Sequence, residues 1–148
     1  MLFRSKDQVL SSAMLTRELG KTLSEEFEGA GILKSAYVKN VPVYIPAFTD
    51  SEVGLDLGTW AMGQNLDWAR GHTEREEGDI GVIKALHQAH PSFNPYLDLN
   101  SYTEHLLSAT RLGIFTIGGG VPRNWAQQIA PYVEISNLRL GLDLRPDR

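Results

Sequence analysis

Residues 113–130 read GIFTIGGGVPRNWAQQIA, and this stretch determines the predicted fold. Residues 113–117 are apolar and rich in β-branched and aromatic side chains, as expected of a buried strand. Three glycines follow, Gly118, Gly119 and Gly120, and residues 124–130 have the composition of a helix. A strand, a glycine turn and a helix form the ligand site of many α/β proteins. Glycine lets the backbone approach a ligand, and the helix N-terminus attracts anions.

The spacing of these glycines is not specific for one function. It differs from G-x-G-x-x-G, and no P-loop lysine follows it. Two interpretations therefore remain open at this point, a nucleotide-binding loop and a plain tight turn into a packed helix.

The composition narrows the class of protein. A chain of 148 residues with 42% hydrophobic and 22% charged residues can form one globular domain with a core. The net charge of -4 argues against a nucleic-acid partner and is compatible with a cationic ligand. The absence of cysteine excludes disulfides and thiolate nucleophiles.

No apolar run has the length of a membrane span, and residues 1–6 lack the apolar stretch of a signal peptide. We therefore expect no membrane association and a cytoplasmic location.

Periodicity predicts alternating helices and strands. The predicted helices cover residues 8–28, 32–38, 52–62, 80–89, 101–111 and 124–130, and the predicted strands cover residues 41–47, 96–99 and 113–117. The helix over 101–111 is predicted from a capping box, Ser101-x-x-Glu104, and Pro131 is expected to end or bend the helix before it. This alternation predicts an α/β fold with a mainly parallel sheet flanked by helices, in a single domain over residues 1–148.

Three carboxylates, Asp50, Glu52 and Asp56, follow the predicted strand over residues 41–47. In an open α/β sheet, ligands bind beyond the carboxyl ends of the strands, where these residues would lie together with the triple glycine. Alternatively, Asp50 caps a helix that has Glu52 in its first turn, and both interpretations can hold together.

The four histidines do not predict a metal site. His87 and His90 are three residues apart, and His72 and His105 complete the set. Metal binding needs more convergent ligands than this spacing supplies, so we predict none.

Two segments carry a resemblance to a known family. Residues 41–50, VPVYIPAFTD, resemble the V-P-V-x-x-P-A-x-T-D stretch of deoxyhypusine synthases. Residues 118–124, GGGVPRN, resemble that family's G-G-G-V-x-K-H segment, and the two segments occur in the family's order. The continuation NWAQQ over residues 124–128 is closer to the bacterial deoxyhypusine synthase-like branch. The resemblance covers approximately residues 8–62 and 93–139.

The resemblance implies an NAD-dependent transferase with a Rossmann-like α/β fold, usually a homotetramer with shared active sites. In this family a hydride passes from spermidine to NAD, and 1,3-diaminopropane is released. The aminobutyl group then passes through an imine on an enzyme lysine to a lysine of a translation factor, or to another amine acceptor in bacterial relatives. By motif position, Asp50 and Gly119 would contact NAD, with Gly118 and Gly120 shaping the turn.

The chain also departs from the family pattern. Asn124 stands where the family has a spermidine-binding histidine, and an amide cannot titrate near neutral pH. The family's spermidine-binding aspartate aligns with Leu55, for which Glu52 or Asp56 would have to substitute.

No W-G-K motif is present, the last lysine is Lys84, and the family's early NAD-binding segment is missing. The resemblance therefore implies a partial domain, with an incomplete fold and no catalytic residue of its own, that is inactive alone. One alternative is a non-catalytic NAD-binding or assembly module. Another is an NAD-consuming enzyme such as a deacylase on a similar fold.

Overall fold

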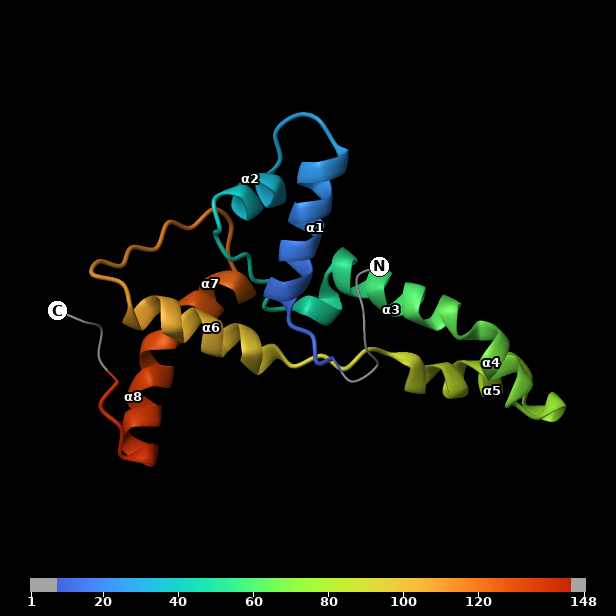
Figure 1. The fold of residues 1–148 in the computed structure, drawn as a ribbon. Coiled ribbons are helices and arrows are strands. Elements are labelled where there is room, and N and C mark those ends of the chain that lie inside the picture. The colour runs from blue at the N-terminus through green and yellow to red at the C-terminus, as the bar shows by residue number, and fades with distance from the viewer. Residues whose placement is uncertain (1–7, 145–148) are drawn as a thin grey trace. The chain divides into compact units, whose positions relative to one another are not determined.

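The structure is a computed structural model that describes residues 8–144, and this part of the chain is helical (Figure 1). The α-helices are α1 (Ser12–Glu26), α2 (Ile32–Val38), α3 (Glu52–Gln64), α4 (Leu66–Gly71), α5 (Gly78–Leu86), α6 (Pro95–Leu107), α7 (Val121–Gln127) and α8 (Ile129–Leu140). Short 3-10 helices are η1 (Phe48–Asp50), η2 (Arg75–Glu77) and η3 (His87–Ala89). Over the described residues, β pairing is limited to one isolated parallel bridge between Leu10 and Phe93.

The predicted α/β fold is therefore wrong. Residues 8–144 contain no strand and no sheet, so they do not form a Rossmann-like parallel sheet flanked by helices. Of the three predicted strands, residues 41–47 and 113–117 lie outside helices and strands, and residues 96–99 lie inside α6. Each of the three predicted strands fails to form for a different physical reason.

The described chain divides into two compact units. Unit 1 consists of residues 8–10 and 48–93, and unit 2 consists of residues 11–47 and 94–144. The chain thus leaves unit 2 after Ala47 and returns to it at Asn94. The prediction of one domain over residues 1–148 stays a prediction, and the predicted absence of a signal peptide concerns residues 1–6, which lie outside the described range.

Helix α1 begins at a polar cap in unit 2. The Ser11 hydroxyl accepts a hydrogen bond from the Met14 amide at 3.4 Å, which satisfies one of the free amides of the first turn. The helix is therefore shorter at its start than the predicted range of 8–28. Leu15 is buried, whereas Phe27, which follows the last helical residue, is 59% exposed.

Helix α1 packs closely against α2. A Cβ atom built on Gly20 of α1 would lie 2.5 Å from the carbonyl oxygen of Leu33 and 2.9 Å from the Cβ of Tyr37. Since real Cβ atoms do not approach backbone this closely, glycine is the residue that permits the contact.

Helix α2 is confirmed at its predicted bounds and ends in a Schellman motif. The Asn40 amide donates to the Tyr37 carbonyl at 3.0 Å, and the Val41 amide donates to the Ala36 carbonyl at 2.8 Å. Asn40 has a φ of 53°, the left-handed conformation that this motif requires and that asparagine tolerates. The motif reverses the chain into residues 41–47.

Residues 41–47 do not form the predicted strand because side chains of α1 bond their backbone. The Thr16 hydroxyl donates to the Val43 carbonyl at 2.7 Å, and the Ile45 amide donates to the Ser12 hydroxyl at 2.7 Å. Backbone groups that a neighbouring strand would pair are thus satisfied by a helix.

Residues 96–99 are helical because an N-terminal signal precedes them. The Asn94 side chain accepts a hydrogen bond from the Tyr96 amide at 3.0 Å, and Pro95 occupies the first helical position. Helix α6 therefore starts at Pro95, and the predicted capping box of Ser101 and Glu104 lies in its interior.

Residues 113–117 have the composition of a strand. The described chain contains no other strand with which they could pair. Ile114 is 56% exposed, and Phe115 and Ile117 are each 88% exposed. A strand forms through hydrogen bonds to a neighbour, so β propensity alone does not make one.

The helix predicted over residues 124–130 is replaced by two helices, α7 and α8. The helical segment is interrupted at Gln128, as expected of Pro131, which has no amide to donate to the carbonyl of Gln127 four residues before it. Pro131 itself lies in the first turn of α8, where that helix needs no bond from its amide. Ile129 and Val133 of α8 are buried with Leu106 of α6 in a small apolar cluster of unit 2.

Unit 1 is built from α3, α4, α5 and the short 3-10 helices. Phe48 is buried and stacks on Phe93 with ring centroids 4.2 Å apart. Ala61, Ala69 and Leu86 are also buried. No helix within residues 8–144 combines the length and the apolar character needed to cross a bilayer.

The buried carboxylate of Asp98 on α6 joins two helices of unit 2. Asp98 is 4% exposed and accepts hydrogen bonds from the Ser12 amide at 3.0 Å, the Ser12 hydroxyl at 2.7 Å and the Ala13 amide at 2.9 Å. These amides belong to the first turn of α1, where a negative charge is stabilising.

Replacing Asp98 by asparagine should destabilise the chain. The amide has a single acceptor oxygen, so at least one of the three donors loses its partner, at a cost of about 2 kcal/mol. The free energy of unfolding in urea, followed by circular dichroism, measures this loss. Glu134→Gln, an exposed change on α8, is the control and should stay within about 0.5 kcal/mol of the wild type. Equal effects of the two changes would contradict the role of Asp98.

Candidate functional site

Asp50 lies at the end of η1 in unit 1, immediately before α3. It is not the helix cap, because the Ser51 hydroxyl accepts the hydrogen bond of the Gly54 amide at 3.1 Å. The exposed carboxylate of Asp50 has no hydrogen-bond or ion-pair partner among the described residues. The interpretation of Asp50 as a cap is therefore wrong, and its carboxylate is available to a ligand.

Glu52 and Asp56 share one face of α3. Glu52 is the first residue of the helix, and Asp56 follows four positions later, the spacing at which helical side chains are neighbours. Both side chains are exposed. Unit 1 therefore presents a pair of carboxylates on the helix that begins directly after Asp50.

The turn formed by the triple glycine lies in unit 2. Its backbone conformation requires glycine at two of the three positions. Gly118 has a φ of 85° and Gly120 a φ of 74°, conformations that side chains rarely adopt, whereas Gly119 does not have a positive φ. A Cβ atom built on any of the three would have no atom within 4 Å. The backbone of this turn is therefore open to close approach.

Asn124 belongs to α7, which follows the glycines. Its amide donates to the Gly120 carbonyl at 3.2 Å, and its carbonyl accepts from the Gln128 amide at 3.0 Å. The exposed side-chain amide makes no hydrogen bond to the described residues. Asn124 can thus offer both a donor and an acceptor to a ligand.

A cluster of aromatic residues follows Asn124 in unit 2, and the sequence did not predict it. Trp125 stacks on Tyr102 of α6 with ring centroids 5.0 Å apart, and Tyr44 lies 5.3 Å from Trp125 and 5.8 Å from Tyr102. The Tyr102 hydroxyl donates to the Ala126 carbonyl at 3.3 Å. These residues come from three distant segments, so no local spacing signals them. The cluster holds α7 beside α6.

The hydroxyl of Tyr44 is partly buried beside Ser101 of α6. The two hydroxyl oxygens are 3.0 Å apart and share a hydrogen bond. Burial raises the pKa of Tyr44 above its usual value, and the nearby carboxylates Asp98 and Glu104 add to this, while the hydrogen bond to Ser101 lowers it. The protonated phenol is therefore the favoured form in the folded chain.

Stability should fall in alkaline solution as Tyr44 ionises. Because its folded pKa lies above the unfolded value, its contribution is complete below about pH 10 and is lost as the pH rises through the folded pKa. Urea unfolding of the wild type and Tyr44→Phe from about pH 8 to 11 measures this. The stability difference between the two should shrink as the pH rises. Tyr96→Phe, an exposed change, should give a pH-independent difference, and the same pH trend in both variants would contradict the assignment.

The described histidines do not gather into a metal site. The rings of His87 and His90 stack with centroids 6.2 Å apart in unit 1. Over residues 8–144, no group of three or more His, Asp or Glu side chains could hold a metal ion.

The site residues predicted from sequence divide between the two units. Unit 1 holds the carboxylates Asp50, Glu52 and Asp56, and unit 2 holds the glycine turn 118–120 and Asn124. Within unit 1 the structure brings the carboxylates to one helix and the turn before it. Within unit 2 it places Asn124 in the middle of α7, the short helix that follows the glycine turn.

Comparison with known proteins connects these residues to one family. The family model described as deoxyhypusine synthase matches residues 2–75, which is half of the chain and includes Asp50, Glu52 and Asp56. The chain is 30% identical over 128 residues to a protein of Methanosarcina acetivorans named "Probable deoxyhypusine synthase 2". It is 29% identical over 134 residues to a "Deoxyhypusine synthase-like protein" of Caulobacter vibrioides, and 29% identical over 126 residues to one of Chlorobaculum tepidum. No solved structure matches the chain significantly.

The match covers most of this chain and a minor part of each relative. The alignment with the Methanosarcina acetivorans protein covers 86% of this chain and 29% of that protein. For Caulobacter vibrioides the values are 84% and 29%, and for Chlorobaculum tepidum they are 84% and 30%. Alignments of this extent necessarily include the triple glycine, which lies well inside both ends of the chain.

Proposed function

The chain belongs to the deoxyhypusine synthase family, and we propose that it serves the NAD-dependent transfer of an aminobutyl group from spermidine or a related polyamine to an amine acceptor. The observation that carries this proposal is the family match over residues 2–75, which places the unpartnered carboxylate of Asp50 inside the matched region. The acceptor is a lysine, in a translation factor or elsewhere, or a small amine.

The carboxylates of unit 1 suit a polyamine. A polyamine carries several ammonium groups, and each needs a carboxylate or a comparable acceptor when it leaves water. Glu52 and Asp56, four positions apart on α3, offer such acceptors with Cβ atoms about 6 Å apart. We assign them to the polyamine in place of the family's aspartate, whose position is Leu55.

Asp50 of unit 1 and the glycine turn of unit 2 are each assigned to the dinucleotide by their positions in the two family motifs. The open backbone at Gly118, Gly119 and Gly120, where no atom lies within 4 Å of a Cβ position, would let phosphate oxygens approach main-chain amides. Asp50 would accept a hydrogen bond from the cofactor. When bound, NAD supplies the site with a hydride acceptor and donor. Asn124 can hydrogen-bond the substrate, but its amide cannot take up or release a proton near neutral pH.

The nucleophilic lysine of the family is not assigned to this stretch. No W-G-K sequence occurs in the 148 residues. Lys34 bonds the Phe27 carbonyl at 2.7 Å, and Lys84 lies on α5. We propose that the imine-forming lysine is supplied from outside residues 1–148, within a homo-oligomer in the cytoplasm.

Asp50→Ala should weaken NAD binding by at least about tenfold, because it removes a charged hydrogen-bond acceptor. The melting temperature should not change, since Asp50 has no partner within the described chain. Calorimetric titration with NAD and thermal unfolding are the measurements. Ser51→Ala is the matched control. It removes the cap of α3 at a cost of about 1 kcal/mol and should leave NAD affinity unchanged below the melting temperature.

Gly119→Ala tests, in the same calorimetric titration with NAD, whether the glycine turn contacts the cofactor. The added methyl group meets no atom and no strained φ, so stability should be kept while NAD binding weakens. Gly118→Ala, with a φ of 85° at the glycine, should instead cost about 1 kcal/mol of stability. Unchanged NAD affinity in both Asp50→Ala and Gly119→Ala would refute the cofactor assignment.

The purified 148-residue chain, given NAD and spermidine, should release no 1,3-diaminopropane, because none of its lysines lies in a W-G-K motif. The protein isolated from its source organism should release it, and Asp50→Ala at the natural locus should abolish the release. Chromatography of the amine products measures both. Release by the 148-residue chain would refute the lysine assignment, and no release by the natural protein would refute the transferase.

A second candidate is a non-catalytic NAD-binding or assembly module. It is favoured by one observation, that carboxylates and a glycine turn suited to ligands occur without the W-G-K motif. NAD binding by the natural protein without amine release would support it.

A further inference from the structure

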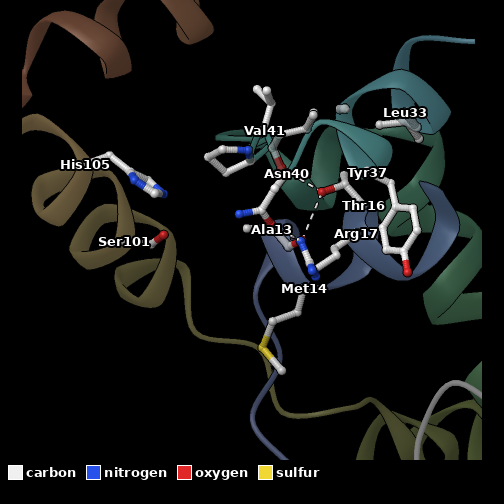
Figure 2. A pocket seen from close by; sticks show the side chains of 13 residues that line it. Ala13, Met14, Thr16, Arg17, Leu33, Tyr37, Asn40, Val41, Ser101 and His105 are labelled. Carbon is white, nitrogen blue, oxygen red and sulfur yellow. Dashed lines mark hydrogen bonds between the residues drawn. The ribbon is translucent and has the colours of Figure 1, made fainter. Parts of the chain in front are cut away.

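Unit 2 contains a pocket of about 250 Å³ that none of the residues assigned to NAD or to the polyamine lines. Its walls come from α1, α2, residues 41–43 and α6 (Figure 2). This volume is slightly below the roughly 300–1,000 Å³ of pockets that hold drug-sized ligands, so the pocket suits a small molecule.

Arg17 of α1 is an exposed residue at the rim of this pocket, and two neutral side chains contact it. Its Nη1 donates to the Oδ1 of Asn40 at 2.7 Å, and its guanidinium carbon lies 5.4 Å from the centre of the Tyr37 ring. The backbone of Asn40 is fixed by the Schellman motif at the end of α2. The ring occupies the face of the guanidinium, and the remaining N–H donors have no partner among the described residues.

The charge of Arg17 is not compensated by the pocket. The lining residues include Arg17 and His105 and no aspartate or glutamate. Glu18 and Glu104, the sequence neighbours of Arg17 and His105, do not line the pocket. Ser101 and His105 of α6 face the pocket across from Asn40 and add a hydroxyl and an imidazole to its polar wall (Figure 2). An anion is therefore the complementary ligand.

We propose that this pocket binds a small organic carboxylate, with Arg17 as its anchor. A guanidinium presents parallel N–H donors that match a planar carboxylate in a bidentate pair. One fixed cation balances one negative charge, whereas a phosphate dianion would need a second cation or several main-chain amides. Leu33, Val41 and Pro42 contribute apolar surface for the body of the ligand.

Benzoate, a planar carboxylate with an apolar body, is the probe. In ¹H–¹⁵N spectra of the 148-residue chain, benzoate should produce saturable shifts of the Arg17 side-chain signal and of the amides of Tyr37 and Asn40, with a Kd in the millimolar range. Benzamide, which has the same shape without the charge, should produce none. Inorganic phosphate should bind at least about tenfold more weakly than benzoate.

Arg17→Gln should weaken benzoate binding by at least about tenfold, because it removes the charged donors. Asn40→Gly keeps the left-handed φ and removes the side chain that orients Arg17, so it should weaken binding without unfolding the chain. Arg139→Gln, which removes one exposed positive charge from α8, is the matched control and should leave the Kd unchanged.

Three results would each overturn the proposal. They are the absence of saturable shifts at the pocket, equal shifts with benzamide, and equal losses in Arg17→Gln and Arg139→Gln. Binding of phosphate as tight as that of benzoate would overturn the assignment to carboxylates. The test is independent of the NAD titration, since the two sets of residues do not overlap.

Discussion

The buried carboxylate of Asp98 organises unit 2. It accepts the amides of Ser12 and Ala13 at the start of α1, and the Ser12 hydroxyl, which donates to it, accepts in turn from the Ile45 amide. One charged group on α6 thereby fixes the N-terminus of α1 and, through one hydroxyl, the segment that follows α2. A buried charge is stable only when its hydrogen bonds are complete, so these three parts of the chain depend on one another.

The position of residues 41–47 follows from this arrangement. It determines the surroundings of two features of unit 2, the aromatic cluster and the pocket that contains Arg17. With Val43 and Ile45 bonded to hydroxyls of α1, Tyr44 reaches the aromatic cluster with Tyr102 and Trp125. The residues just before Tyr44 form one wall of the pocket that contains Arg17. A segment that would be a plain strand in a sheet thus supports both the helix of Asn124 and the proposed carboxylate site.

The residues assigned to the family reaction make few contacts with the rest of the described chain. Asp50 and Asn124 have side chains without partners there, and a Cβ atom at Gly119 would meet nothing. Residues that stabilise the fold, such as Asp98 and Ser51, are instead fully bonded. Stability and ligand binding can therefore be changed separately by substitution.

The sequence by itself determined the family and much of the helix content. The two motifs indicated deoxyhypusine synthases, because glycines, prolines and carboxylates in a set order are specific to a ligand surface. Helix α2, most of α1 and most of α3 followed from the apolar pattern, whereas the residues that cap α1 and α3, Ser11 and Ser51, were not predicted. Asn94 and Pro95 carried a readable start signal for α6 that the apolar pattern of residues 96–99 obscured.

Only the tertiary structure decided which apolar segments pair and which polar groups meet. Residues 113–117 have β propensity, but a strand needs a neighbour, and propensity does not specify one. The three contacts of Asp98 and the pairing of Arg17 with Asn40 join residues far apart in sequence. Such contacts depend on chain reversal and burial, which no local spacing encodes. The candidate ligand residues could therefore be proposed from the sequence, but the contacts around them could not be predicted from it.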